Sequence, residues 1–308
     1  MSEKQKKDKL IFNFQLSIIN YFVSLDKVLS LRNKNKQGFI LYSLHLIVPL
    51  HPMKQAMIFA AGLGTRLKPI TDTMPKALVP VDGKPLLWHV IEKLKRLGFE
   101  RIVVNVHHFA DQIIDYLKQN DNFGLDILIS DEREFLLETG GGIRKALPLF
   151  DSQSPILIHN VDILSNADLD ELLTREGDAS LLVSSRQTKR YLLFDEDLRM
   201  TGWTNIETGE VRGPAANSQL STLNSQLKRL AFSGIHVLKP SLFPLLKAMP
   251  ERFGIMDFYL KYCDNYVLRG CLQDGLQLID VGKLDSLDKA EHFVIGFPRR
   301  RRTLFQNS

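Results

Sequence analysis

From Gln55 onward, hydrophobic positions follow two alternating patterns. Short runs of consecutive apolar residues are typical of buried parallel strands, and they alternate with segments whose apolar residues recur every three or four positions, as on one helix face. The strand-like runs are 55–60, 101–106, 126–129, 156–159 and 179–183. The helical patterns are 86–97, 110–117 and two that begin at Gly142 and Asp168. This alternation predicts an α/β fold with a doubly wound, mainly parallel, Rossmann-like sheet.

After Ser184 the pattern changes to hairpin-like strands, which predict a small antiparallel region at 191–194, 200–203 and 230–237. Inside it, Asn-Ser-Gln-Leu occurs twice at seven-residue spacing, and we interpret about 215–227 as an insertion in a surface loop. A short interaction helix there is the alternative. The remaining expected elements are helices at 242–248, 255–263 and 283–293 and strands near Val267 and Leu278.

The two ends of the chain differ from this body. Residues 1–52 contain four lysines near the start and an apolar stretch, 10–28, that polar residues interrupt. We expect an extension outside the fold, with translation starting at Met53 or Met57; an interfacial basic helix over 10–28 is the alternative. The predicted domains are therefore this extension, one folded domain at 53–296 and a basic tail at 297–308.

Charge and composition exclude several classes of protein. The 308 residues carry a net charge of +5, but the two ends hold all of it, because residues 53–298 contain 28 basic and 32 acidic side chains. Binding of nucleic acid by the body is therefore not expected. No apolar run reaches the roughly 18–20 residues of a membrane-spanning helix. Two cysteines fit a reducing compartment, so we expect a cytoplasmic protein.

A glycine loop directly follows the first predicted strand, with the sequence Ala-Ala-Gly-Leu-Gly-Thr-Arg over 60–66. In a parallel sheet this position lies at the carboxyl edge, where α/β proteins bind nucleotides. Leu67 stands where a dinucleotide fingerprint has its third glycine, and the P-loop pattern is absent. Two cations, Arg66 and Lys76, accompany the loop, which suits a triphosphate and a second anionic substrate.

The stretch Gly-x-Gly-Thr-Arg-x-x-Pro-x-Thr-x-x-x-Pro-Lys-x-x-x-Pro-Val over 62–81 is similar to the signature of the sugar-phosphate nucleotidyltransferases. The resemblance extends over about 55–296, through the motifs at 137–142, 232–235 and 279–282. It implies the nucleotide-diphospho-sugar transferase fold. Within the family, the chain most resembles the N-acetylmuramate α-1-phosphate uridylyltransferases and the short mannose-1-phosphate guanylyltransferases.

The resemblance also implies a role for each matching residue. Arg66 and Lys76 would be catalytic, Asp162 and Asp280 would bind Mg²⁺, and two sets of residues would bind substrates. The nucleotide would contact Ala60, Ala61, Gly62, Leu63, Gly64, Thr65, Glu138 and Gly141. The sugar phosphate would contact Asn105, Glu138, Thr139 and Gly142.

The residues themselves make these roles chemically sensible. Asp162 and Asp280 each follow a predicted strand, so both can face one edge of the sheet, where two carboxylates could hold Mg²⁺ against the α-phosphate. Taken singly, an aspartate at a strand end is a common cap or turn residue. The family usually has Gly-Asp here, whereas this chain has Val161-Asp162, which keeps the carboxylate but adds a side chain where glycine leaves the backbone free.

Some polar and aromatic residues have a plain structural interpretation beside the functional one. Asn105 ends a strand and would contact sugar hydroxyls or cap the strand. His107, His108 and His159 lack metal-ligand spacing and are interpreted as polar residues at strand ends. Trp203 and Phe232 would line the sugar pocket or pack in the core.

We therefore predict Mg²⁺-dependent transfer of a nucleoside monophosphate from an NTP to a sugar 1-phosphate, with release of pyrophosphate. The favoured pair is UTP with N-acetylmuramic acid 1-phosphate, a step of peptidoglycan recycling. Mannose-1-phosphate guanylyl transfer and glucose-1-phosphate thymidylyl or uridylyl transfer are alternatives. A non-catalytic sugar-nucleotide sensor is the alternative of another class. The expected assembly is a monomer or a small homo-oligomer.

Overall fold

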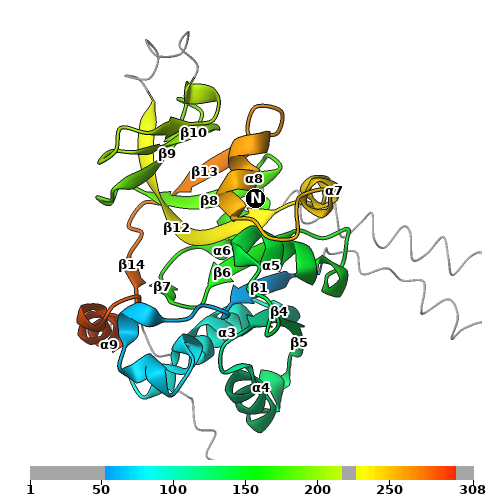
Figure 1. The fold of residues 1–308 in the computed structure, drawn as a ribbon, viewed down its shortest axis with the longest axis vertical. Helices are drawn as coiled ribbons and strands as arrows, with labels where there is room; N and C mark the ends of the chain where they lie inside the picture. The colour runs from blue at the N-terminus through cyan, green and yellow to red at the C-terminus, as the bar shows by residue number, and fades with distance from the viewer. Residues whose placement is uncertain (1–52, 217–226, 296–308) are drawn as a thin grey trace, which may run out of the picture. The chain divides into compact units, whose positions relative to one another are not determined.

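The computed structural model describes residues 53–216 and 227–295 (Figure 1). The proposed extension at 1–52, most of the Asn-Ser-Gln-Leu insertion and the basic tail lie outside the described residues, so the predicted domain boundaries stay predictions. No helix within 53–216 or 227–295 has both the length and the apolar character that crossing a membrane requires.

The central sheet is mainly parallel, as the sequence predicted. Strand β1 (Gln55–Phe59) lies between β4 (Arg101–Val106) and β6 (Ile156–Asn160), and all three run in the same direction. Strand β5 (Asp126–Asp131) continues the sheet beyond β4. On the other side, the long β12 (Lys228–Leu238) pairs antiparallel with β6. Next to β12 follow β8 (Ala179–Ser184) and β13 (Leu268–Leu272), which are parallel to each other.

The predicted antiparallel region is also present. The amino-terminal end of β12 pairs with β9 (Arg190–Phe194), which continues into β10 (Met200–Asn205) and the short β11 (Val211–Arg212). Two small ribbons complete the strands. They are β2–β3 (Pro80–Val81 with Lys84–Pro85) and β7–β14 (Ile163–Ser165 with Leu278–Asp280). The predicted α/β fold, with a doubly wound sheet and a small antiparallel region, is thus confirmed.

Helices pack on both faces of the sheet (Figure 1). Along β1, Ala56 and Ile58 belong to one hydrophobic core and Met57 belongs to the other, because successive side chains of a strand point to opposite faces. The helices that contribute to the first core are α3 (Leu86–Arg96), α4 (Ala110–Gln119), α6 (Leu169–Thr174) and α9 (Leu287–Ile295). Those of the second core are α5 (Glu138–Ala146), α7 (Phe243–Lys247) and α8 (Ile255–Tyr262).

Helix α5 begins at Glu138, four residues before the start at Gly142 that the sequence suggested. Glycines are poor helix formers, so the run at 140–142 reads as a loop. The helix forms because contacts with residues 251–255 hold its first turn, as the site shows below. Tertiary packing overrides local propensity here.

Lys93 of α3 ties this helix to β7. Its Nζ donates to the backbone oxygen of Ser165 at 3.0 Å and to the Ser165 hydroxyl at 3.2 Å. Burial, helped by the charge of Arg96, lowers the pKa of Lys93 from 10.5 to about 8. Between these two pH values, Lys93 is therefore protonated to a greater extent in the unfolded chain than in the folded protein.

Because of this shift, the contribution of Lys93 to the free energy of unfolding should rise with pH between about 8 and 10.5, by up to about 3 kcal/mol, whereas Cys263 and Cys271, whose pKa burial raises to about 11, contribute with the opposite sign. Lys93→Met should remove this dependence, since the only titrating group changed is the buried ammonium. Urea unfolding across this pH range tests the prediction, with the exposed Lys118→Met on α4 as control. An unchanged pH slope in Lys93→Met would contradict it.

Candidate active site

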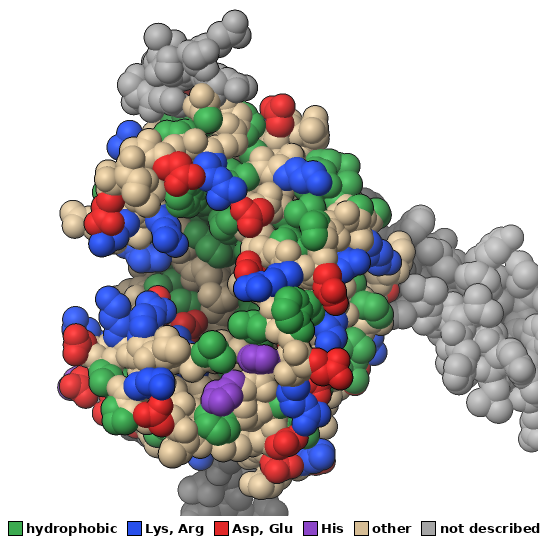
Figure 2. Space-filling model, viewed as in Figure 1, with side chains coloured by type: hydrophobic (Ala, Val, Ile, Leu, Met, Phe, Trp, Pro, Cys, Tyr) green, Lys and Arg blue, Asp and Glu red, His purple; other side chains and the backbone are tan. Residues whose placement is uncertain are grey.

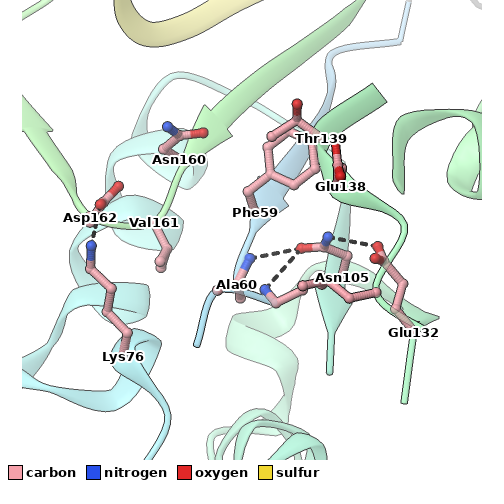
Figure 3. A pocket seen from close by; sticks show the side chains of 13 residues that line it. Phe59, Ala60, Lys76, Asn105, Glu132, Glu138, Thr139, Asn160, Val161 and Asp162 are labelled. Atoms are coloured by element: carbon pink, nitrogen blue, oxygen red, sulfur yellow. Dashed lines mark hydrogen bonds and ion pairs between the residues drawn. The ribbon is translucent and has the colours of Figure 1, made fainter. Parts of the chain in front are cut away.

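A cavity of about 270 Å³ opens at the carboxyl ends of β1, β4 and β6, where sequence reasoning placed the site (Figure 3). Its lining joins the start of the glycine loop, the residues after β5 and β6, and the first turn of α5. The lining residues are Phe59, Ala60, Ala61, Gly62, Lys76, Asn105, Glu132, Leu136, Glu138, Thr139, Asn160, Val161 and Asp162. In Figure 2, Lys and Arg side chains gather on both rims of a hollow at the left of the described face.

The glycine loop leaves β1 and closes in a tight turn. Gly64 has φ +64°, and a Cβ there would lie 2.9 Å from Cγ2 of Thr71, so this position favours glycine. The Thr71 hydroxyl donates to the Gly64 carbonyl at 2.8 Å, which holds the turn. Among the described residues, the backbone amides of Gly62, Leu63 and Gly64 have no hydrogen-bond acceptor. Backbone N–H groups in such a turn are suited to bind phosphate oxygens.

Asn105 lies near the end of β4 and borders the cavity, and its predicted contact with sugar hydroxyls stays a prediction. Its Oδ1 accepts from the backbone amides of Ala60 at 2.8 Å and Ala61 at 3.3 Å, and its Nδ2 donates to Oε1 of Glu132 at 2.8 Å (Figure 3). These contacts use the amides at 60 and 61 within the protein. Asn105 borders the cavity, but its polar atoms are committed to the loop and to Glu132. Sequence reasoning missed Glu132; the available signal was an acidic residue directly after β5.

Lys76 and Asp162 form an ion pair at the edge of the cavity (Figure 3). Lys76 opens a short 3-10 helix, Lys76–Leu78, after Pro75, and is only 8% exposed. Asp162 follows β6. The ion pair holds the Lys76 side chain where the glycine loop and the end of β6 meet.

Asp280 is brought beside Asp162 by the β7–β14 ribbon. Asp280 pairs with Ile163, and the Val281 amide donates to the Asp162 carbonyl at 2.8 Å. Although part of the Asp280 side chain is exposed, burial of the rest and the nearby Asp162 charge raise its carboxyl pKa. The charges of Lys76, Arg66 and Arg186 oppose this rise. Two carboxylates thus share one site despite their repulsion.

Arg66 and Arg186 supply further positive charge near Asp280. A Cβ on Gly282 would lie 3.1 Å from a guanidinium nitrogen of Arg66 and 2.6 Å from Oδ1 of Asp280, so both side chains converge there. Arg186, which follows β8, donates to the Phe232 carbonyl at 3.0 Å. Sequence reasoning did not single out Arg186, because nothing in its local pattern distinguishes it from a solvent-exposed arginine.

The two carboxylates fit Mg²⁺ in number and chemistry. Magnesium sites on phosphate substrates commonly use one or two protein carboxylates and complete the shell with phosphate oxygens and water. The pair Asp162 and Asp280, held together against their own repulsion, matches that donor set. Within the described residues, no group of three or more His, Cys, Asp or Glu side chains could hold a metal by itself.

The glycines that open α5 are packed against other segments. A Cβ on Gly140 would lie 2.2 Å from the Phe253 ring, and one on Gly141 would lie 2.3 Å from the Glu251 carbonyl oxygen. The amides of Gly140 and Gly141 both donate to the Phe253 carbonyl, at 2.9 and 3.1 Å. The Gly141 amide is therefore engaged within the protein. The predicted contact of Gly141 with nucleotide stays a prediction that this geometry does not favour.

Two other residues of this motif face the cavity. Glu138 has φ +64°, and its carboxylate accepts from Nε of Arg252 at 3.0 Å. The Thr139 hydroxyl accepts from the Ile255 amide at 2.9 Å and also borders the cavity. Gly142 is enclosed by Glu132 and Phe59. Of the predicted substrate-binding set, Glu138 and Thr139 are thus the side chains that line the cavity with polar atoms near its surface.

The remaining candidates occupy mostly structural positions. His159 is buried; burial lowers its pKa to about 3, and its ring donates to the Asn160 carbonyl at 2.8 Å. His107 donates to the Glu132 carbonyl at 2.7 Å. Trp203 and Phe232 pack against the second core. Val161 has no positive φ and is buried in the first core, so a side chain fits where the family has glycine.

Comparison with known proteins agrees with this geometry. Residues 55–189 match the family model described as nucleotidyl transferase. The chain is 36% identical over 199 residues to the N-acetylmuramate alpha-1-phosphate uridylyltransferase of Caulobacter vibrioides, a match over 61% of this chain and 76% of the relative. It is 28% identical to the D-glycero-alpha-D-manno-heptose 1-phosphate guanylyltransferase of Campylobacter jejuni, over 78% of this chain and 99% of the relative.

A solved structure supports the fold. The chain superposes on HddC from Yersinia pseudotuberculosis complexed with GMP-PN with a TM-score of 0.63 and 24% identity, over 79% of this chain and all of that one. The parallel sheet, the glycine loop at its carboxyl edge and the extent of the sequence match lead to one assignment. The chain belongs to the nucleotidyl transferase family and is an enzyme of the sugar-1-phosphate nucleotidyltransferase class.

Proposed function

We propose that this enzyme uses Mg²⁺ to join UTP to N-acetylmuramic acid 1-phosphate, giving the nucleotide-diphospho-sugar and pyrophosphate. The observation that carries the reaction type is the cluster of Lys76, Asp162 and Asp280 beside the glycine loop, whose amides have no acceptor among the described residues. The preference for this substrate pair is supported by two uridylyltransferase relatives, from Caulobacter vibrioides at 36% and Neisseria meningitidis at 35% identity.

In this proposal, the amides of Gly62, Leu63 and Gly64 bind the triphosphate, and Arg66 and Lys76 stabilise the charge that spreads over its oxygens during transfer. A phosphate oxygen of the sugar 1-phosphate attacks the α-phosphorus, and the bond to the pyrophosphate oxygen breaks. The attacking oxygen is already ionised at neutral pH, so no general base is needed.

Asp162 and Asp280 are the residues that would hold Mg²⁺, which when bound supplies charge neutralisation and orientation of the phosphates. Lys76 shares the carboxylate of Asp162, so its ammonium is held close to the same phosphates. Glu138 and Thr139, on the opposite wall of the cavity, would contact the nucleobase or the sugar. Both cysteines are free, which supports a cytoplasmic location.

The test is pyrophosphate release by the full-length chain with Mg²⁺, crossing four NTPs with N-acetylmuramic acid, mannose, glucose and heptose 1-phosphates. We expect release chiefly with UTP and N-acetylmuramic acid 1-phosphate. Reactions without the sugar phosphate and reactions without Mg²⁺ are the controls, and neither should release pyrophosphate.

Other outcomes separate the alternatives. Release with GTP and mannose or heptose 1-phosphate would keep the reaction and replace the substrate pair; the Campylobacter jejuni guanylyltransferase makes that pair the second candidate. Nucleotide binding without release across the whole panel would contradict the proposed activity and favour a sensor.

A further inference from the structure

Two polar side chains are buried together between the glycine loop and helix α5. Asn105, at the end of β4, is 2% exposed, and Glu132, directly after β5, is 1% exposed. A buried carboxylate is costly unless hydrogen bonds compensate for the lost water. The Glu132 carboxylate accepts two such bonds, one from Nδ2 of Asn105 at 2.8 Å (Figure 3) and one from the Leu137 amide at 3.2 Å.

Glu132 determines which way the Asn105 amide points. A carboxylate only accepts hydrogen bonds, so Nδ2 of Asn105 must face Glu132 and Oδ1 must face the opposite way. There, Oδ1 accepts from the amides of Ala60 and Ala61. A flipped Asn105 would instead direct its NH₂ group at two N–H donors. The buried carboxylate thus selects the orientation that holds the start of the glycine loop.

The same carboxylate holds the opposite wall of the cavity. Its second oxygen accepts from Leu137, the residue just before Glu138 and Thr139. Gly142 also packs on it, since a Cβ there would lie 2.8 Å from Oε1 of Glu132. One side chain therefore connects the phosphate side of the cavity with the wall formed by α5.

We propose that Asn105 and Glu132 are a pair of positioning residues for nucleotidyl transfer. They hold the glycine loop so that the amides of Gly62, Leu63 and Gly64 face the triphosphate. They also fix the position of the loop relative to Glu138 and Thr139 on the opposite wall of the cavity. The identity of the ligand in this inference rests on the proposed function. Displacement of a substrate by about 1 Å can lower a rate by about 10²-fold, so loss of this pair should be visible in binding and turnover.

The donors and acceptors of the pair define an exchange experiment. Glu132→Gln alone places an NH₂ group against either Asn105 or the Leu137 amide. Asn105→Asp alone places two carboxylates 2.8 Å apart. The double variant restores every bond. Its new carboxylate at position 105 would accept from both loop amides and from the new side-chain NH₂ at position 132, and the amide oxygen at position 132 would accept from Leu137.

Full-length variants are compared by the dissociation constants of UTP and GTP with Mg²⁺ and no sugar phosphate, and by kcat/KM for the active substrate pair. Each single substitution should weaken nucleotide binding and lower kcat/KM by roughly 10–100-fold. The double variant should return to within about threefold of the parent, as a strongly coupled pair requires. Ser130→Ala is the matched control. Ser130 is 3% exposed and is paired with Asn105 in the β4–β5 register, and its hydroxyl has no hydrogen-bond partner among the described residues.

Parental nucleotide binding and kcat/KM in both single variants would overturn the proposal. So would a folded double variant whose losses equal the sum of the two single ones. If the single variants do not fold, the double variant is compared with the parent alone. Near-parental nucleotide binding and kcat/KM in the double variant support the proposal, and their loss in a folded double variant overturns it. If the unmodified enzyme binds nucleotide but shows no turnover, the proposed function is refuted. The positioning role is then still tested by the nucleotide dissociation constants of the single and double variants. A parent that binds no nucleotide refutes both.

Discussion

Asp280→Asn should lower turnover by about 10³-fold or more while the protein stays folded. The substitution keeps the shape of the side chain and removes one of the two negative charges that would hold Mg²⁺. Metal stabilisation of a transferring phosphoryl group is worth several kcal/mol, and about 4 kcal/mol corresponds to three powers of ten in rate. Asp162→Asn should have a similar effect, but it also removes the ion-pair partner of Lys76, so Asp280→Asn is the cleaner variant.

The measurement is the initial rate of pyrophosphate release as Mg²⁺ is titrated, with thermal unfolding as the check on folding. Asp115→Asn, which changes an exposed carboxylate on α4, is the control and should behave as the parent. A folded Asp280→Asn variant with a near-parental rate and Mg²⁺ requirement would refute the metal assignment.

Arg66→Ala should lower turnover by about 10²-fold or more, the size typical of losing one preorganised group that stabilises transition-state charge. The Arg66 guanidinium converges with Asp280 on Gly282, beside the carboxylate pair and outside the lining of the cavity. We therefore expect Arg66 to act on the phosphates and to contribute little to recognition of the nucleobase.

Steady-state kinetics with both substrates varied tests this role. The loss should be mainly in kcat, and Arg66→Lys should recover part of it, because a lysine keeps the charge without the forked guanidinium. Lys68→Ala is the control: Lys68 is two residues away, 60% exposed, and paired with Asp72 at 2.9 Å. Equal losses in Lys68→Ala and Arg66→Ala would show a general effect of loop charge and contradict a specific role.

Much of the fold was predictable because its signals are local. After Gln55, strand β1 is a run of apolar residues with buried side chains on both faces, and α3 shows a regular apolar stripe that is followed by Gly98. The glycine loop and its cations were equally readable, because the motif at 62–81 is continuous in sequence. The order of these signals alone predicted a parallel sheet with a phosphate-binding edge.

Other features had weaker signals or misleading ones. The three-residue β7 is too short to show a periodicity, and the glycines of α5 argue against the helix that they begin. Asn105 was expected to contact the sugar or to cap its strand, yet its side chain holds the glycine loop. The acidic Glu132 resembles any surface residue until β4, β5 and α5 enclose it.

The α/β class, the position of the glycine loop and the residue types available for phosphate chemistry therefore follow from the amino-acid sequence alone. They depend on hydrophobic periodicity and on motifs whose members are neighbours in the chain. Two features of the site became visible only in the folded molecule: the β7–β14 ribbon that brings Asp280 to Asp162, and the hydrogen bond by which Glu132 orients Asn105. The physical reason is that strand pairing and the burial of polar partners depend on contacts between distant segments, which local patterns do not encode.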